Sequence, residues 1–140
     1  MKKIFQPIVL ALIKKDSKYL LTLRNEKGHS QSLFNGLWQL PGGGVEFGES
    51  VEEALVREVK EELGVSVIIV QIVPKLLHRV RNGMWHGLFI CFLCTLVNEN
   101  EIIHLNHEAS EWDWFTADEI KRLKKLSGID EMIEASDIHK

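Results

Sequence analysis

Short runs of apolar residues separated by polar turns dominate the first third of the chain. Residues 6–14 and 19–24 are crowded with Ile, Leu and Val, and polar residues 16–18 lie between them, so we predict two strands joined by a turn. The polar segment 25–36 contains two glycines and is expected to form a loop. A short strand is predicted over 37–40, immediately before a proline.

Three consecutive glycines and a helical pattern follow. Glycines 42–44 are expected to form a turn whose bare backbone can approach a ligand closely. Ser50 and Glu53 have the spacing of a capping box, and Gly64 is suited to end a helix, so a helix is predicted over 51–63. The expected apolar stripe of this helix comprises Val51, Leu55, Val56, Val59 and Leu63.

The second half of the chain again has the pattern of β-structure. Residues 66–80 are rich in Val and Ile and predict either one long strand or two strands broken at Pro74. The Asn82-Gly83 pair is typical of a hairpin turn, and the returning strand is expected over 85–97. The remaining predictions are a short strand at 112–115, a helix from the Thr116–Glu119 capping box to about 126, and a short helix within 128–140.

The composition is that of one folded domain. The 140 residues are 45% hydrophobic and 26% charged, and two halves would each be too small to bury a sizeable core. Because βαβα alternation is absent, we predict an α+β fold with a mixed sheet, in a single domain over 1–140. The longest apolar run, residues 8–13, is too short to cross a bilayer, and the basic start lacks the apolar segment of a signal peptide. A cytoplasmic protein without membrane contacts is therefore expected.

Charge and cysteine usage narrow the possible functions. The net charge is −3 and no basic run exceeds two residues, so binding to a nucleic acid polymer is not expected. An anionic substrate would instead require a cation or a local basic cluster. Cys91 and Cys94 lie three residues apart in a predicted strand, so they should point to opposite faces. We interpret them as buried core residues rather than as a redox or zinc pair.

Three glutamates near the end of the predicted helix carry the clearest chemical signal. Glu58, Glu61 and Glu62 are spaced so that their carboxylates could reach one point on the helix surface. Like charges repel at these spacings, and the negative end of the helix dipole disfavours them further. A hard divalent cation such as Mg²⁺ would offset both effects. The alternative is a solvated acidic face on which Arg57 pairs with Glu53 or Glu61.

The segment 43–65 resembles the Nudix box, Gly-x5-Glu-x7-Arg-Glu-U-x-Glu-Glu-x-Gly-U, in which U is a bulky aliphatic residue. The lead-in at 38–43 and the segment 111–115 are also similar to this family. The resemblance is to MutT-like Nudix hydrolases and implies an α/β/α sandwich around a mixed β-sheet. All nine fixed positions are filled, by Gly43, Glu49, Arg57, Glu58, Val59, Glu61, Glu62, Gly64 and Val65.

The resemblance also implies a metal-dependent reaction. Nudix hydrolases use Mg²⁺ or Mn²⁺ and an attacking water to cleave a nucleoside diphosphate linked to another group. The implied metal ligands are Glu58, Glu61 and Glu62, with the carbonyl of Gly42 or Gly43 as a further ligand. Glu61 is expected to take part in catalysis as well.

Further roles follow from the same resemblance. Glu58 is the first candidate for the general base, Arg57 would orient it, and Glu49 would pair with Arg57. An acidic residue before a helix N-terminus is the simpler reading of Glu49. A carboxylate outside the box, Glu108 or Glu111, would complete the metal site, and we favour Glu108. For each of these two, the alternative is an exposed loop acid.

Substrate contacts are suggested by residue type. Trp85, Phe34 and Trp112 could stack on a base, and Asn35 could hydrogen-bond to its edge. Arg24 could meet a phosphate. Gly43 would let the substrate approach the backbone. Ordinary packing is the alternative for the aromatic residues, and solvation is the alternative for Arg24.

The expected substrate is a nucleoside triphosphate, canonical or oxidised, that is cleaved to monophosphate and pyrophosphate. The alternatives are an ADP-ribose or dinucleotide polyphosphate pyrophosphatase, and a Nudix-like module that binds nucleotides without catalysis. An isopentenyl diphosphate isomerase would require a catalytic cysteine and a longer chain. The protein is expected to be a monomer or a homodimer.

Overall fold

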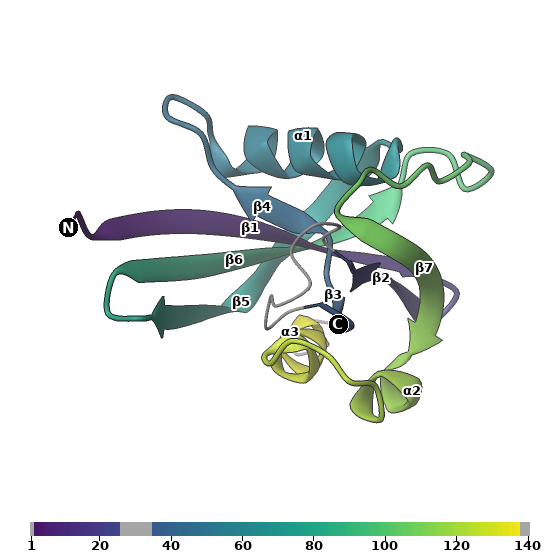
Figure 1. Ribbon diagram of the computed structural model, residues 1–140. Helices are drawn as coiled ribbons and strands as arrows, with labels where there is room; N and C mark the ends of the chain where they lie inside the picture. Colours follow the sequence, from purple (N-terminus) through teal and green to yellow (C-terminus); the bar gives the residue numbers. More distant parts are fainter. Residues whose placement is uncertain (1, 26–34, 138–140) are drawn as a thin grey trace.

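The computed structural model describes residues 2–25 and 35–137. Within these residues, short turns or loops join most consecutive elements (Figure 1). The strands are β1 (Ile4–Lys15), β2 (Lys18–Arg24), β3 (Trp38–Gln39), β4 (Gly42–Gly44), β5 (Val67–Arg81), β6 (Trp85–Leu96) and β7 (Ala109–Thr116). The helices are α1 (Val51–Leu63), α2 (Ala117–Lys121) and α3 (Ile129–Ser136).

The strands form a mixed sheet, as predicted. The order along the sheet is β3-β2-β1-β6-β5, with β4 paired to β1 and β7 paired to β2. Only the β1–β6 pair is parallel among the pairs of the described strands, and it runs in register from Ile4 opposite Trp85 to Ile13 opposite Cys94. The central strand β1 therefore carries β4, and with it the glycine segment, directly against the middle of the fold.

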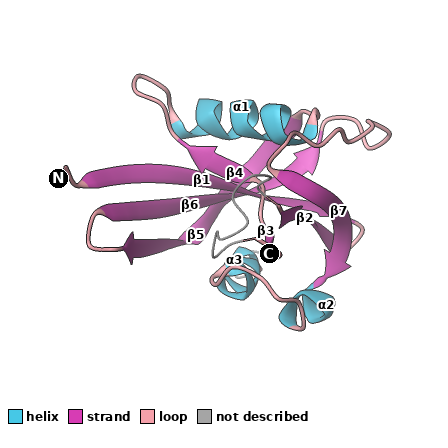
Figure 2. Ribbon diagram, viewed as in Figure 1, coloured by secondary structure: helices cyan, strands magenta, loops and turns pink. Residues whose placement is uncertain are grey.

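Helices cover both faces of the sheet (Figure 2). On one face, α1 buries Leu55, Val59 and Leu63 against β1 and β6. On the other face, α2 and α3 bury residues such as Ile120 and Met132. This arrangement confirms the α/β/α sandwich, because each face of the sheet buries its apolar side chains under a helix.

Helix α1 has the predicted bounds because both of its ends are capped. The Ser50 hydroxyl accepts a hydrogen bond from the Glu53 N–H at 3.1 Å, and Glu53 Oε1 accepts one from the Ser50 N–H at 3.0 Å. Gly64 ends the helix in the left-handed region at φ 70°. The predicted apolar stripe was wrong at Val56, which is 40% exposed because it lies at the margin of the buried face.

The structure corrects one prediction about β-structure and decides between the two alternatives of another. Glycines 42–44 form strand β4 rather than a turn, because their backbone pairs antiparallel with β1. Of the two alternatives for segment 66–80, the single strand is confirmed: β5 continues past Pro74, and its pairing with β6 shifts between Ile72 and Leu76. Pro74 is tolerated there because β5 is an edge strand and the proline falls at an irregularity.

Two boundaries near the C-terminus also differ from the prediction. Strand β7 starts at Ala109 rather than at residue 112, because it pairs with the whole of β2. Helix α2 ends at Lys121 rather than near residue 126. The following segment hydrogen-bonds to β3 instead, since the Trp38 N–H donates to the Lys124 carbonyl and the Leu126 N–H donates to the Trp38 carbonyl, both at 3.0 Å.

The two cysteines lie as predicted. Cys91 is buried in the core under α2 and α3, and Cys94 is buried in the core under α1. Burial raises the pKa of both thiols, to about 12 for Cys94, so neither is a reactive thiolate at neutral pH. No helix within residues 2–25 and 35–137 is long and apolar enough to cross a membrane.

The capping box of α1 is open to a direct test. Ser50→Ala removes the hydroxyl that accepts from Glu53 and is expected to lower the free energy of unfolding by about 1 kcal/mol. Ser50→Asp retains an acceptor and should keep most of that stability. Urea denaturation of the three proteins checks this prediction, and an Asp variant as unstable as the Ala variant would contradict it.

Candidate active site

Strand β4 presents its backbone alternately to β1 and to α1. The Pro41 carbonyl accepts from Ala11 N–H at 2.8 Å, and Val45 N–H donates to the Pro7 carbonyl at 3.0 Å. Gly42 and Gly44 therefore turn their polar groups away from β1. Gly42 N–H donates to Glu62 Oε2 at 2.9 Å, and the Gly44 carbonyl accepts from Arg57 at 3.0 Å. This alternation fixes the helix glutamates against the glycine strand.

Arg57 links the glycine strand, the segment before α1 and the helix itself. Its guanidinium grips Glu49 with two hydrogen bonds of 2.6 and 2.9 Å and donates to Glu58 Oε1 at 3.0 Å. Glu49 also accepts from the Glu46 N–H at 3.0 Å. The hydrogen bonds from Arg57 hold the pKa of Glu49 down, at about 2, so this carboxylate stays charged. Glu49 and Arg57 thus fix the position of the Glu58 carboxylate, as expected for supporting residues.

The Glu58 carboxylate lies directly over Gly43. A Cβ atom at position 43 would stand only 2.5 Å from the Glu58 carboxyl carbon, so a larger residue would displace the carboxylate. At Gly42, a Cβ atom would overlap the Val9 carbonyl oxygen. Both glycines are required by close approach, rather than by a flexible turn.

The carboxylates of Glu58 and Glu62 are withdrawn from water. Burial is the main cause that raises the pKa of Glu62 to about 8, with further contributions from the charges of Glu58 and Glu108. Burial also raises the pKa of Glu58, against the opposing effect of Arg57. The Arg24 charge lowers the pKa of Glu62 and so lies close enough to act on the same site. Like charges that are desolvated together are stabilised by a cation.

The residues fit a divalent cation, although no metal cage is preformed. Within the part of the chain that the structure describes, no three His, Cys, Asp or Glu side chains already surround a single point. Glu61 departs from the expected cluster: its side chain is 56% exposed and lies 3.3 Å from Arg57, whereas Glu62 turns inward to Gly42. Glu58 and Glu62 supply the hard oxygen donors that Mg²⁺ or Mn²⁺ prefers. The neighbouring charge of Glu108 raises the pKa of both glutamates further, and a bound cation would offset this repulsion.

A cavity of about 250 Å³ opens beside Gly42 and Gly43. Arg24 and Trp85, two of the predicted substrate contacts, line it. Polar lining also comes from Gln39, Arg79, Arg81 and Ser127. The apolar part of the lining is Ile8, Leu10, Leu40, Leu77, Phe89, Leu126, Ile129 and Met132. The cavity therefore combines apolar and cationic walls, and it shares Gly42 and Gly43 with the carboxylate pair.

Two arginines of this cavity were missed from the sequence. Arg79 lies over the Phe89 ring at 5.4 Å and donates to the Ser127 hydroxyl at 2.6 Å, while Arg81 lies over the Trp85 ring at 4.7 Å. Burial and the charges of Arg79 and Arg24 lower the pKa of Arg81, which places the three guanidinium groups in one electrostatic neighbourhood. The alternation along β5 was the available signal, since Arg79 and Arg81 share one face.

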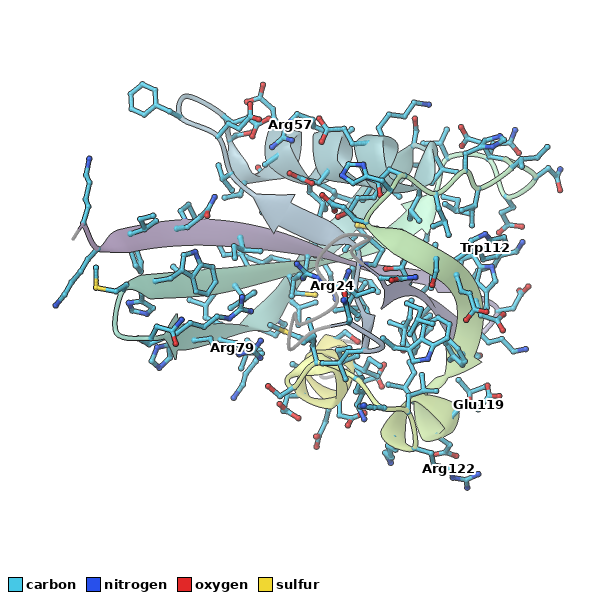
Figure 3. The ribbon with its side chains drawn as sticks, in the orientation of Figure 1. Arg24, Arg57, Arg79, Trp112, Glu119 and Arg122 are labelled. Carbon is cyan, nitrogen blue, oxygen red and sulfur yellow. The ribbon has the colours of Figure 1, made fainter. Side chains whose placement is uncertain are left out.

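Other predicted residues lie elsewhere. Glu111 and Trp112 line a separate hollow with Trp38 and Phe115. Figure 3 shows Trp112 on β7, on the other side of the view from Arg79. Asn35 is half-buried and does not line the cavity. Phe34 falls outside the described residues.

Comparisons with known proteins show the family to which the chain belongs. The family model described as the NUDIX domain matches residues 5–135. The chain is 33% identical over 122 residues to nucleoside triphosphatase NudI of Escherichia coli O139:H28, covering 81% of this chain and 83% of the relative. It is 37% identical over 120 residues to the protein of the same name from Salmonella agona, with the same coverage. The crystal structure of a MutT protein from Methanosarcina mazei Go1 matches with a TM-score of 0.78 at 26% identity, covering 96% of this chain and 94% of that one.

Half-buried carboxylates on a helix lie against a glycine strand beside an arginine-lined cavity, and together with the family match they identify a hydrolase of phosphoric anhydrides. The chain belongs to the Nudix hydrolase family and is a MutT-like enzyme. Its substrates are small nucleotides in which a nucleoside diphosphate is linked to another group, and the family generally uses divalent metal ions.

The raised pKa of Glu62 makes the metal-free protein sensitive to pH. A carboxyl whose pKa is about 8 when folded and near 4.5 when unfolded stabilises the fold below pH 4.5, and that contribution is lost as the pH rises to 8. In EDTA, Glu62→Gln should match the wild type near pH 4.5 and be more stable at pH 8.5, by on the order of 2 kcal/mol. Chemical denaturation across this range tests the prediction, and parallel stability curves for the two proteins would refute it.

Proposed function

We propose that the protein hydrolyses a nucleoside triphosphate to the monophosphate and pyrophosphate. The observation that carries this proposal is the half-buried pair Glu58 and Glu62, held against Gly43 and Gly42. The same two glycines line a cavity together with Arg24, Arg79 and Arg81. Carboxylates that require a cation and a cluster of guanidinium groups together suit a substrate with several phosphates. The name of the two curated relatives, nucleoside triphosphatase, supports the same choice.

Mg²⁺ or Mn²⁺ would be held by Glu58 and Glu62, with Glu61, Glu108 and the Gly42 carbonyl as further candidates. When bound, this cation neutralises the phosphate oxygens and lowers the pKa of the attacking water. Glu61 would reach the cation only by leaving Arg57. Glu108 is the better placed of the two outer carboxylates, since its charge acts on both Glu58 and Glu62.

Glu58 is the proposed general base. Its carboxylate is held over Gly43 by Arg57, and burial raises its pKa toward the range in which a base accepts protons well. In the reaction, the water oxygen forms a bond to one phosphorus of the α–β bridge, and the bridging oxygen leaves with the other phosphate. Glu58 takes the proton released by the water, and Arg57 holds the Glu58 carboxylate in position.

The nucleoside is proposed to occupy the cavity beside Gly43. Trp85 and Phe89 offer aromatic surfaces to a base, and the guanidinium groups of Arg24, Arg79 and Arg81 offer donors to phosphate or base oxygens. The apolar side chains of the cavity suit the flat faces of a base. The single-domain organisation over 1–140 and the cytoplasmic location stay predictions.

A panel of nucleotides tests the proposal. With Mg²⁺ or Mn²⁺, at least one canonical or 8-oxo nucleoside triphosphate should give monophosphate and pyrophosphate in equal amounts. Glu58→Gln should lower kcat by about 10²- to 10⁴-fold, because the general base is lost. Product release followed by anion-exchange chromatography provides the measurement.

The control is Glu52→Gln, which removes an exposed carboxylate from the same helix and should leave turnover unchanged. Activity confined to ADP-ribose or dinucleotide polyphosphates would keep the chemistry and overturn the choice of a triphosphate. Full activity of Glu58→Gln would overturn the assignment of the base.

A further inference from the structure

The β5–β6 hairpin carries two histidines that the proposed active site does not use. His78 lies on β5 and His86 on β6, diagonally across the strand pair, since His78 is opposite Leu88 and His86 is opposite Val80. The pocket residues Arg79, Arg81 and Trp85 alternate with them along the strands and point to the other face. The two histidines therefore lie on the α1 face of the sheet, away from the nucleotide cavity.

The two imidazole rings share a hydrogen bond, and the distance between their bonded nitrogens is close to that between two ligands of one metal ion. His78 Nδ1 and His86 Nε2 are 3.2 Å apart, and the ring planes are inclined at 60°. Two nitrogens bound to one tetrahedral zinc ion at about 2.0–2.1 Å lie roughly 3.3 Å apart. The pair thus has the spacing of two ligands of one ion, and imidazole is a ligand that suits Zn²⁺ rather than Mg²⁺.

One chain supplies only half of such a site. Structural zinc sites in proteins take four ligands, and no group of three or more potential ligands occurs among residues 2–25 and 35–137. A second copy of the chain, related by a two-fold axis, would present the same two histidines from the opposite side. A zinc ion on that axis would then have four nitrogen ligands.

The surroundings of the pair suit contact with a second copy. Phe5 packs edge-on against His86, with ring centroids 4.8 Å apart, yet is 62% exposed. Leu76 and Val80, on the same face of β5, are 59% and 56% exposed. The hairpin and the start of β1 project beyond α1, so this helix does not cover them (Figure 1). Exposed apolar side chains that lie close together mark surfaces at which proteins associate.

We infer that His78 and His86 form half of a zinc site, and that two copies of the chain join face to face around one Zn²⁺ ion bound by both pairs. The ion is structural and separate from the hard cation of the active site. The apolar residues Phe5, Leu76 and Val80 are buried where the copies meet. This inference does not depend on the proposed substrate.

Light scattering after size-exclusion chromatography tests the inference on the full chain. Excess Mg²⁺ is kept present to occupy the carboxylate site, and half an equivalent of Zn²⁺ is then added. The molar mass should double, with one zinc retained per two chains, and EDTA should restore the monomer. His78→Gln and His86→Gln should each remain monomeric with zinc.

The matched control is His104→Gln, because His104 is an exposed histidine far from the hairpin in sequence and should dimerise like the wild type. Three results would overturn the inference: an unchanged mass with zinc, one zinc per monomeric chain, or a dimer that both hairpin variants also form. The first of these would mean that the two imidazoles merely hydrogen-bond to each other. Nucleotide turnover is not part of the readout, so failure here leaves the proposed function untouched.

Discussion

The ion pair between Arg57 and Glu49 is the interaction on which the active site depends. The bidentate pair joins the segment before α1 to the helix itself, and the same guanidinium reaches the Gly44 carbonyl of β4 and the carboxylate of Glu58. Strand β4 is in turn paired with the central strand β1. One planar cation with several donors can hold three parts of the chain in fixed geometry, which a lysine could not do.

This arrangement holds two carboxylates in partly desolvated positions, where their charged forms are unfavourable without a cation. Glu62 is half-buried against Gly42, and Glu58 lies over Gly43. The pKa of each is raised by burial and by the charge of Glu108. The metal-free protein bears the resulting cost in stability. Such local conflict between stability and chemistry is expected at functional sites. The close approach of Glu58 to Gly43 and of the Val9 carbonyl to Gly42 leaves no room for a side chain at either glycine.

Much of this could be predicted from the sequence, because capping boxes and the spaced motif are local signals. Helix α1 and the segment 43–65 needed only residue types at fixed spacing. The strand formed by glycines 42–44 could not be predicted, because its pairing with β1 depends on a distant partner. Glu61 and Glu62 diverge because Arg57 pairs with the first and the Gly42 N–H with the second. Arg79 and Arg24 line one cavity only after β5 joins the sheet. Long-range contacts thus account for what the pattern missed.

The central claim is that the inward-facing Glu62 provides a ligand for a divalent cation. Calorimetric titration of Mn²⁺ into the nucleotide-free protein tests it most directly, with Glu62→Gln compared with Glu52→Gln on the exposed side of the same helix. The account predicts wild-type affinity for Glu52→Gln and a loss of about 10- to 100-fold or more for Glu62→Gln. Equal affinity in all three proteins would contradict it.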